Sequence, residues 1–167
     1  MELIQKNSLL WEYLSENQQG LILDGEHLLT DARLTKNLTS VSDYSYVVFP
    51  FAKAYEGFLK KLFLDLDVIK EDDYYGDDIR IGRILNPNYK GRNSVYNKLC
   101  NNKRAGKDLV FRLWEIWRKG RNYVFHYYPH NFRKLNYEEA AGIIEEMVSV
   151  MDDSITKCDI VANSIAS

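Results

Sequence analysis

The amino-acid sequence predicts an all-α protein, on three observations. Apolar residues recur at helical spacing in three long stretches, few stretches alternate as β-strands do, and the longest connection is rich in glycine, asparagine and aspartate. Apolar residues make up 46% of the 167, and aromatic residues 13%, enough for one packed core. We therefore expect one domain, residues 1–167, built as an up-and-down bundle of four to five helices.

Residues 108–132 form the most apolar helix. We expect Asp108 to cap this helix and Pro129 to end it. Its apolar stripe comprises Leu109, Val110, Leu113, Trp114, Ile116, Trp117 and Val124. At about 100° per residue, Arg121 projects at the edge of this stripe and His126 on the polar face. An arginine pressed toward a core needs a carboxylate or a phosphate, because an unpaired buried charge is costly.

A second strong stripe runs from Asp43, a candidate helix cap, to residue 68. Within it, Glu56 has apolar neighbours on the helical wheel, so its carboxylate should be protonated or paired with a cation. Glu56 and Arg121 are therefore predicted partners. The alternative, that each meets another group or extends to water, stays open.

The remaining elements are weaker. Helices are expected over residues 3–14 and 28–38, with Gly20 and Gly25 loosening the segment between them. Residues 71–107 should be an irregular connection with short turns at 79–85 and 94–99, and Asn136 should cap the last helix, whose inward stripe reaches Ile160. Residues 43–163 would form the bundle core and residues 1–40 an N-terminal helical extension.

Charge and composition exclude several classes. No run approaches the roughly 20 apolar residues that span a bilayer, and the first residues do not resemble a signal peptide. Cys100 and Cys158 lie far apart, so we expect a reduced, cytoplasmic setting. Twelve of the 22 Lys and Arg residues fall between residues 80 and 121, just after an acidic stretch. This asymmetry fits either a self-neutralising surface or a local basic surface for RNA.

Common catalytic motifs are missing from the sequence: it contains no phosphate-binding glycine loop and no GxSxG, HExxH or CxxC. His126 and His130 have metal-ligand spacing, but Pro129 interrupts the helix there and no third ligand is near, so we expect neither a metal nor a cofactor. What remains is Arg121, four residues, then His126, with polar Asn122 after the arginine.

This Arg-x4-His pattern on a late helix of a small bundle resembles the HEPN superfamily. AYEGFLKKLF at residues 54–63, the Ile81-Gly82 dipeptide and RNYVFH at 121–126 resemble, in this order, the HEPN ribonuclease domain of the RNase LS toxin family. The resemblance covers about residues 45–130. It implies a metal-independent endoribonuclease, a toxin of a toxin–antitoxin or anti-phage system, whose composite active site forms in a homodimer and whose partner is a protein antitoxin.

The implied roles agree with the chemistry of the side chains. His126 would exchange a proton with the 2′-OH of RNA or with the leaving oxygen, Arg121 would hold the scissile phosphate, and Glu56 would orient Arg121. The candidate substrate-binding residues are Asn122, Lys119 and Arg118.

Two other functions stay open. The run from Arg121 to Tyr128 also reads Arg-x4-His-x-Tyr, which resembles HepT-type HEPN toxins. That resemblance implies a regulatory module in which Tyr128 accepts AMP. The third possibility is a non-catalytic helical adaptor, in which Arg121 and His126 are ordinary pairing residues.

Overall fold

A computed structural model of the chain describes residues 2–38, 40–91, 95, 99 and 103–156, with only the backbone described for 103–106. These residues contain seven α-helices and no strand, which confirms the all-α class. The helices are α1 (Leu9–Tyr13), α2 (Glu16–Thr35), α3 (Ser45–Asp65), α4 (Glu71–Tyr75), α5 (Ile81–Leu85), α6 (Lys103–Trp117) and α7 (Tyr137–Thr156).

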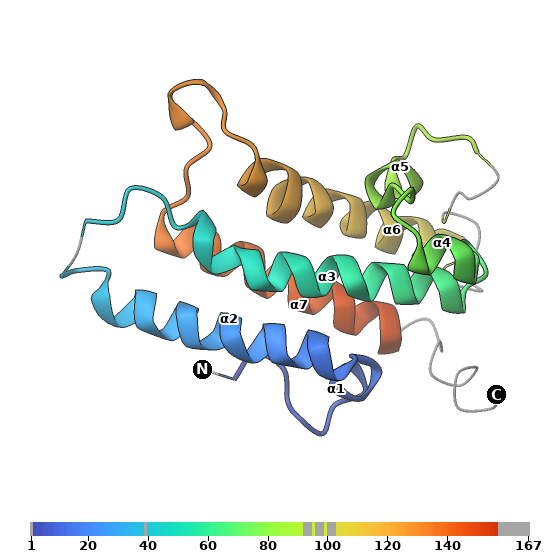
Figure 1. The fold of residues 1–167 in the computed structure, drawn as a ribbon, viewed down its shortest axis with the longest axis horizontal. Helices are drawn as coiled ribbons and strands as arrows, with labels where there is room; N and C mark the ends of the chain where they lie inside the picture. The colour runs from blue at the N-terminus through green and yellow to red at the C-terminus, as the bar shows by residue number, and fades with distance from the viewer. Residues whose placement is uncertain (1, 39, 92–94, 96–98, 100–102, 157–167) are drawn as a thin grey trace.

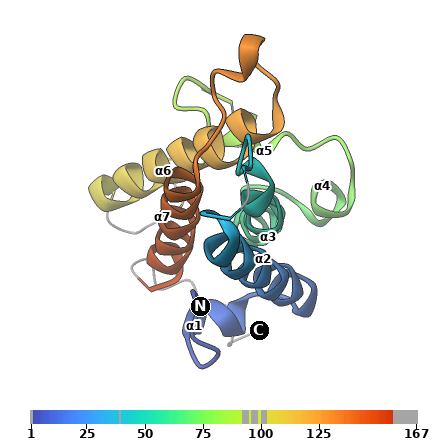
Figure 2. The same cartoon turned by 90° about the vertical axis from the view of Figure 1, so that its left-hand side faces the viewer.

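Four long helices form the bundle, and consecutive ones run in opposite directions (Figure 1). Helix α3 packs against α2 on one side and α7 on the other, and α6 packs on α7 (Figure 2). The short helices α4 and α5 lie near the end of α3 (Figure 1). The four long helices agree with the expected bundle of four to five helices. The structure adds three short helices of five residues each.

Helix α3 supplies the centre of the core. Phe51, Tyr55, Phe58 and Phe63 are all at most 1% exposed, and the helix continues through Pro50. The Tyr55 hydroxyl donates a hydrogen bond to the carbonyl of Leu113 in α6 at 2.9 Å. Burial raises the pKa of Tyr55 well above its ordinary value. Six of the 22 aromatic residues lie in this helix, and these four form the centre of the core.

Helix α2 contradicts the expectation of a loose N-terminal region. Ser15 and Gln18 form a capping box at its start, and the helix passes through both Gly20 and Gly25 without a break. A Cβ atom at Gly25 would lie only 2.5 Å from the Phe51 ring, so this glycine serves close packing of α2 on α3. Ile22 and Leu29 belong to the same hydrophobic cluster as α3 and α7. The helix expected over residues 3–14 is only the short α1.

Asp43 is not the cap of α3 that the sequence predicts, because Tyr44 occupies the N-cap position, but its side chain fixes the start of the helix. Its carboxylate accepts hydrogen bonds from the amides of Ser45 at 2.9 Å and Leu135 at 3.1 Å. The Ser45 hydroxyl and the Asn131 side chain donate two more, at 2.6 Å and 3.0 Å. Partial burial would raise the pKa of Asp43, but these hydrogen bonds outweigh it and hold the pKa below the usual value. One carboxylate therefore fastens the start of α3 to the segment before α7.

Helix α6 begins and ends at other residues than the sequence predicts. It begins at Lys103, so Asp108 lies inside the helix and is not its cap. After Trp117 the chain continues as a π-helix, Arg118–Tyr123, and not as an α-helix up to Pro129. A short 3-10 turn, Pro129–Asn131, follows.

The start of α7 agrees with the sequence. Asn136 accepts a hydrogen bond from the Glu139 amide, and the Glu139 carboxylate accepts one from the Asn136 amide, both at 2.8 Å. The expectations for Cys100, Cys158 and Ile160 lie outside the described residues, as does most of the predicted turn at 94–99.

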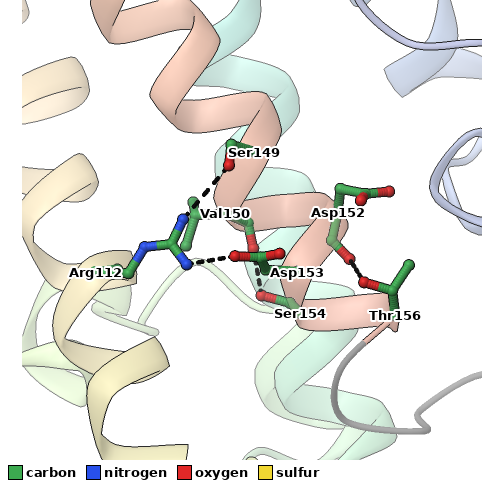
Figure 3. Close-up of polar contacts among 7 residues, drawn as sticks. All are labelled: Arg112, Ser149, Val150, Asp152, Asp153, Ser154 and Thr156. Carbon is green, nitrogen blue, oxygen red and sulfur yellow. Dashed lines mark hydrogen bonds and ion pairs between the residues drawn. The ribbon is translucent and has the colours of Figure 1, made fainter. Parts of the chain in front are cut away.

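Polar contacts also join α6 to α7. The Arg112 guanidinium forms an ion pair with Asp153 and donates a 3.5 Å hydrogen bond to Ser149 (Figure 3). One turn of α7 away, the Ser154 hydroxyl donates to the carbonyl of Val150 at 2.7 Å (Figure 3). Arg112 thus links α6 to α7, and its charge is already paired with a carboxylate. In the part of the chain that the structure describes, no helix combines the length and apolar character needed to cross a membrane.

Candidate functional site

The structure brings Glu56 and Arg121 together, as the sequence predicts. The Nε atom of Arg121 lies 3.7 Å from Oε2 of Glu56, within ion-pair range and too long for a hydrogen bond. Their side chains are 36% and 37% exposed, so the pair lies at the margin of the core and not inside it. An ion pair this exposed contributes at most about 1 kcal/mol to folding. The main effect of the ion pair is therefore to position the Arg121 guanidinium.

Aromatic rings provide the rest of the surroundings of Arg121. Its guanidinium carbon lies 5.3 Å from the Trp117 ring centroid and 5.7 Å from that of Phe125, both cation–π distances. Phe125 in turn packs on Phe49 of α3, with 5.2 Å between ring centroids. Trp117 is buried, whereas Phe125 and Phe49 are 41% and 49% exposed. The guanidinium is therefore fixed on an aromatic base at the rim of an exposed aromatic patch.

The segment that carries Arg121 is the π-helix. Its wider turn aligns residues five apart, and the Arg118 guanidinium accordingly lies over the Tyr123 ring at 5.5 Å. Gly120 is buried against α7, where a Cβ atom would lie 2.6 Å from Cε of Met147. Short π-helical turns inside helices are rare and occur frequently at functional sites. The periodicity of 3.6 used on the sequence cannot describe this turn.

His126 lies just beyond the end of the helix, whose last helical residue is Phe125. Its side chain is exposed, as are those of Phe125 and Tyr127 beside it. Because the helix stops between Arg121 and His126, the two side chains are not bound to the faces of one regular helix. Among the described residues, no three His, Cys, Asp or Glu side chains gather as metal ligands would.

Two of the candidate substrate-binding residues form ion pairs with neighbouring helices. Lys119 forms a 3.2 Å ion pair with Glu146 of α7, and Arg118 a 2.9 Å ion pair with Glu115 of α6. Their carboxylate partners thus lie in α7 and α6, whereas the partner of Arg121 lies in α3. Asn122 is half-buried.

Tyr128, the candidate modification site, is also half-buried. Its ring packs edge-on against Tyr123 at 6.2 Å and Phe132 at 5.5 Å. The ring is thus part of a packed aromatic group beside the π-helix.

Two features of the site were missed from the sequence. A Cβ atom at Gly82 in α5 would lie 2.7 Å from Nε1 of Trp117, so this glycine lets α5 approach the ring beneath Arg121. The Ile81-Gly82 dipeptide was the available signal, but only through the resemblance. Phe49 gave no signal, because one exposed aromatic on a helix is ordinary.

Fold and site together define an all-α bundle that presents an arginine–carboxylate pair on aromatic rings, next to an exposed histidine. Comparison with models of protein families, with curated protein sequences and with solved structures finds no match to this chain.

Proposed function

We propose that this chain is a metal-independent endoribonuclease of HEPN type that cleaves RNA through its own 2′-OH. The observation that carries the proposal is the setting of Arg121, which lies against Glu56, Trp117 and Phe125 five residues before an exposed His126. The contact with Glu56 uses Nε, and a guanidinium has four further N–H donors. In the described part of the chain, no hydrogen bond engages its terminal nitrogens, so they can meet a phosphate in paired fashion.

The reaction needs only proton transfer and charge stabilisation. The 2′-oxygen attacks phosphorus and loses its proton to a base, while the bond to the 5′-oxygen breaks and that oxygen gains a proton. The products are a 2′,3′-cyclic phosphate and a 5′-hydroxyl. Imidazole can accept or donate a proton near neutral pH, which suits His126. Arg121 would offset the charge that builds up on the pentacovalent phosphate, and Glu56 would position Arg121.

A homodimer supplies the second imidazole. One histidine cannot be base and acid in the same instant, whereas two copies related by a twofold axis would bring two His126 side chains to one phosphate. The half-exposed Phe49 and Phe125 rings beside Arg121 are a suitable apolar contact for such a pair. The resemblance to RNase LS toxins supports a role in a toxin–antitoxin or anti-phage system, with a protein antitoxin as the restraining partner.

Cleavage of single-stranded RNA in the presence of EDTA tests the proposal. The wild type should leave 2′,3′-cyclic phosphate ends, and His126→Ala and Arg121→Ala should abolish them. His27→Ala and Arg33→Ala, which change exposed residues of α2, are the matched controls and should cleave normally. Intact RNA after incubation with a high concentration of folded wild-type protein would reject the nuclease.

A further inference from the structure

A second candidate site lies beside the π-helix, away from Glu56. Residues of the π-helix, of segment 132–135 and of the first turns of α7 line a hollow of about 480 Å³. Arg121 and Glu56 are not among its lining residues. Small-ligand sites typically enclose about 300–1,000 Å³, so the hollow has room for a ligand of that class.

Arg133 is the unusual group in the wall of this hollow. Its guanidinium carbon lies 3.6 Å from the centroid of the Tyr123 ring, 4.6 Å from that of Tyr128 and 5.3 Å from that of Phe132. Its Nε atom is buried and has no hydrogen-bond partner among the described residues. The three rings hold the guanidinium in the wall of the hollow by cation–π contacts, and a buried donor without a partner is rare enough to mark the group as unusual.

The charges around the hollow leave a positive excess. Of its two carboxylates, Glu146 pairs with Lys119 at 3.2 Å, and Glu139 accepts the Asn136 amide at the start of α7. Three cationic side chains, Lys119, Arg133 and Lys134, line the hollow against these two carboxylates, an excess of one positive charge. The ligand that balances these charges is an anion.

The remaining walls favour a flat apolar group joined to that anion. Phe132 lines the hollow yet is 64% exposed, so its ring is open to stacking. Val124, Leu135 and Ile143 add a partly buried apolar surface. An aromatic ring beside cations is the combination by which proteins hold unpaired nucleotides, because every base has a face that stacks.

We propose that this hollow binds one unpaired nucleotide, with its phosphate at Arg133 and Lys134 and its base against Phe132. Resting on the proposed function, the nucleotide belongs to the RNA strand whose scissile phosphate lies at Arg121. A free nucleotide carries the same chemistry, so the experiment separates the two sources.

Binding is measured without cleavage, in the His126→Ala protein, by fluorescence anisotropy with a labelled eight-nucleotide single-stranded RNA. Phe132→Ala should raise the Kd by about 5- to 100-fold, the effect of one lost base stack. Lys134→Gln should raise it less and lower the salt dependence by about one unit of slope, as for one lost phosphate contact. Tyr75→Ala and Lys70→Gln, exposed positions at α4, are the matched controls and should bind as the parent does.

The outcomes distinguish this site from the nuclease itself. Equal RNA binding by all variants would overturn the subsite, while the cleavage assay would still decide the nuclease. AMP is titrated as the free nucleotide. If Phe132→Ala abolishes AMP binding but leaves RNA binding unchanged, the assignment to the RNA strand is overturned. If neither RNA nor AMP binds to the parent protein, the inference falls whatever the cleavage assay shows.

Discussion

At the residue scale, the pairing of Glu56 with Arg121 could be predicted from the sequence, but its depth could not. A helical wheel identifies which residues sit at the margin of an apolar stripe. It does not reveal that the margin of α3 meets the π-helix at the surface, where both side chains are about one-third exposed. Depth depends on how the helices pack, and that is a property of the whole bundle.

Glu56→Gln separates the positioning role of this carboxylate from any role in stability. The amide keeps the size of the side chain and removes its charge. Unfolding should change by less than about 1 kcal/mol, because the ion pair is exposed. Single-turnover RNA cleavage should slow by about 10- to 100-fold, because Arg121 loses the group that orients it.

Glu115→Gln is the control, since it removes the carboxylate that pairs with Arg118 and leaves the Glu56 pair untouched. An unchanged cleavage rate in Glu56→Gln would show that Glu56 does not position Arg121.

At the element scale, two expectations fail for one reason. The sequence predicts that Gly20 and Gly25 loosen the chain and that a period of 3.6 residues continues through residues 118–123, and the structure has a continuous α2 and a π-helix there. In both places tertiary packing overrides local preference: Gly25 admits the Phe51 ring, and Gly120 admits Met147 and Ile143. Elements with local signals, such as the Asn136 capping box, were predicted correctly.

Two glycines of α2 make a matched pair for this explanation. Gly25→Ala should lower the free energy of unfolding by about 1–3 kcal/mol, because a methyl group there overlaps the buried Phe51 ring. Gly20→Ala meets nothing within 4 Å and should raise it by up to about 1 kcal/mol through helix propensity. Urea denaturation of both variants measures the difference. Equal effects would show that close packing is not the reason for Gly25.

The contacts of Asp43 predict a loss of stability in acid. Its pKa is lowered in the folded protein, so its contribution is complete above the ordinary carboxyl pKa and disappears as the pH falls through the folded value. Asp43→Asn should lower unfolding free energy at about pH 7 by about 1–2 kcal/mol and flatten its decline toward acid pH.

Urea denaturation between about pH 7 and about pH 3 gives this profile. Asp24→Asn, at an exposed position of α2, is the reference. An acid decline as steep in Asp43→Asn as in the wild type would contradict the assignment.

At the scale of the whole molecule, the sequence predicts the all-α class but does not predict that the N-terminal region packs into the common core. Long apolar stripes sufficed for an antiparallel bundle. The division into a core at 43–163 and an extension at 1–40 came from the weak pattern before residue 40, yet Ile22 and Leu29 of α2 are buried in the common core. The basic stretch between residues 80 and 121 does not form one uniform basic surface. Arg112, Arg118 and Lys119 in it each pair with a carboxylate.

The proposed dimer makes a prediction at this scale. Phe49→Ser should convert a dimer to a monomer in sedimentation velocity and abolish cleavage, because the composite site needs both copies. Phe111→Ser changes a phenylalanine of α6 that is also about half exposed, 52% against 49%, and should change neither property. A wild-type monomer that cleaves RNA would refute the composite site while leaving the chemistry intact.

The fastening at Asp43 has a mechanical consequence. The Tyr44 amide donates to the Leu135 carbonyl at 2.9 Å, next to the bond from the Leu135 amide to Asp43. These bonds join the two ends of the segment from residue 43 to residue 135 and so close it into a loop. Glu56, Arg121 and His126 lie within this loop. Tension applied to the two termini would reach residues 43–44 and 135 along the chain and cross between them through these bonds, so the loop between them would stay closed until the bonds break.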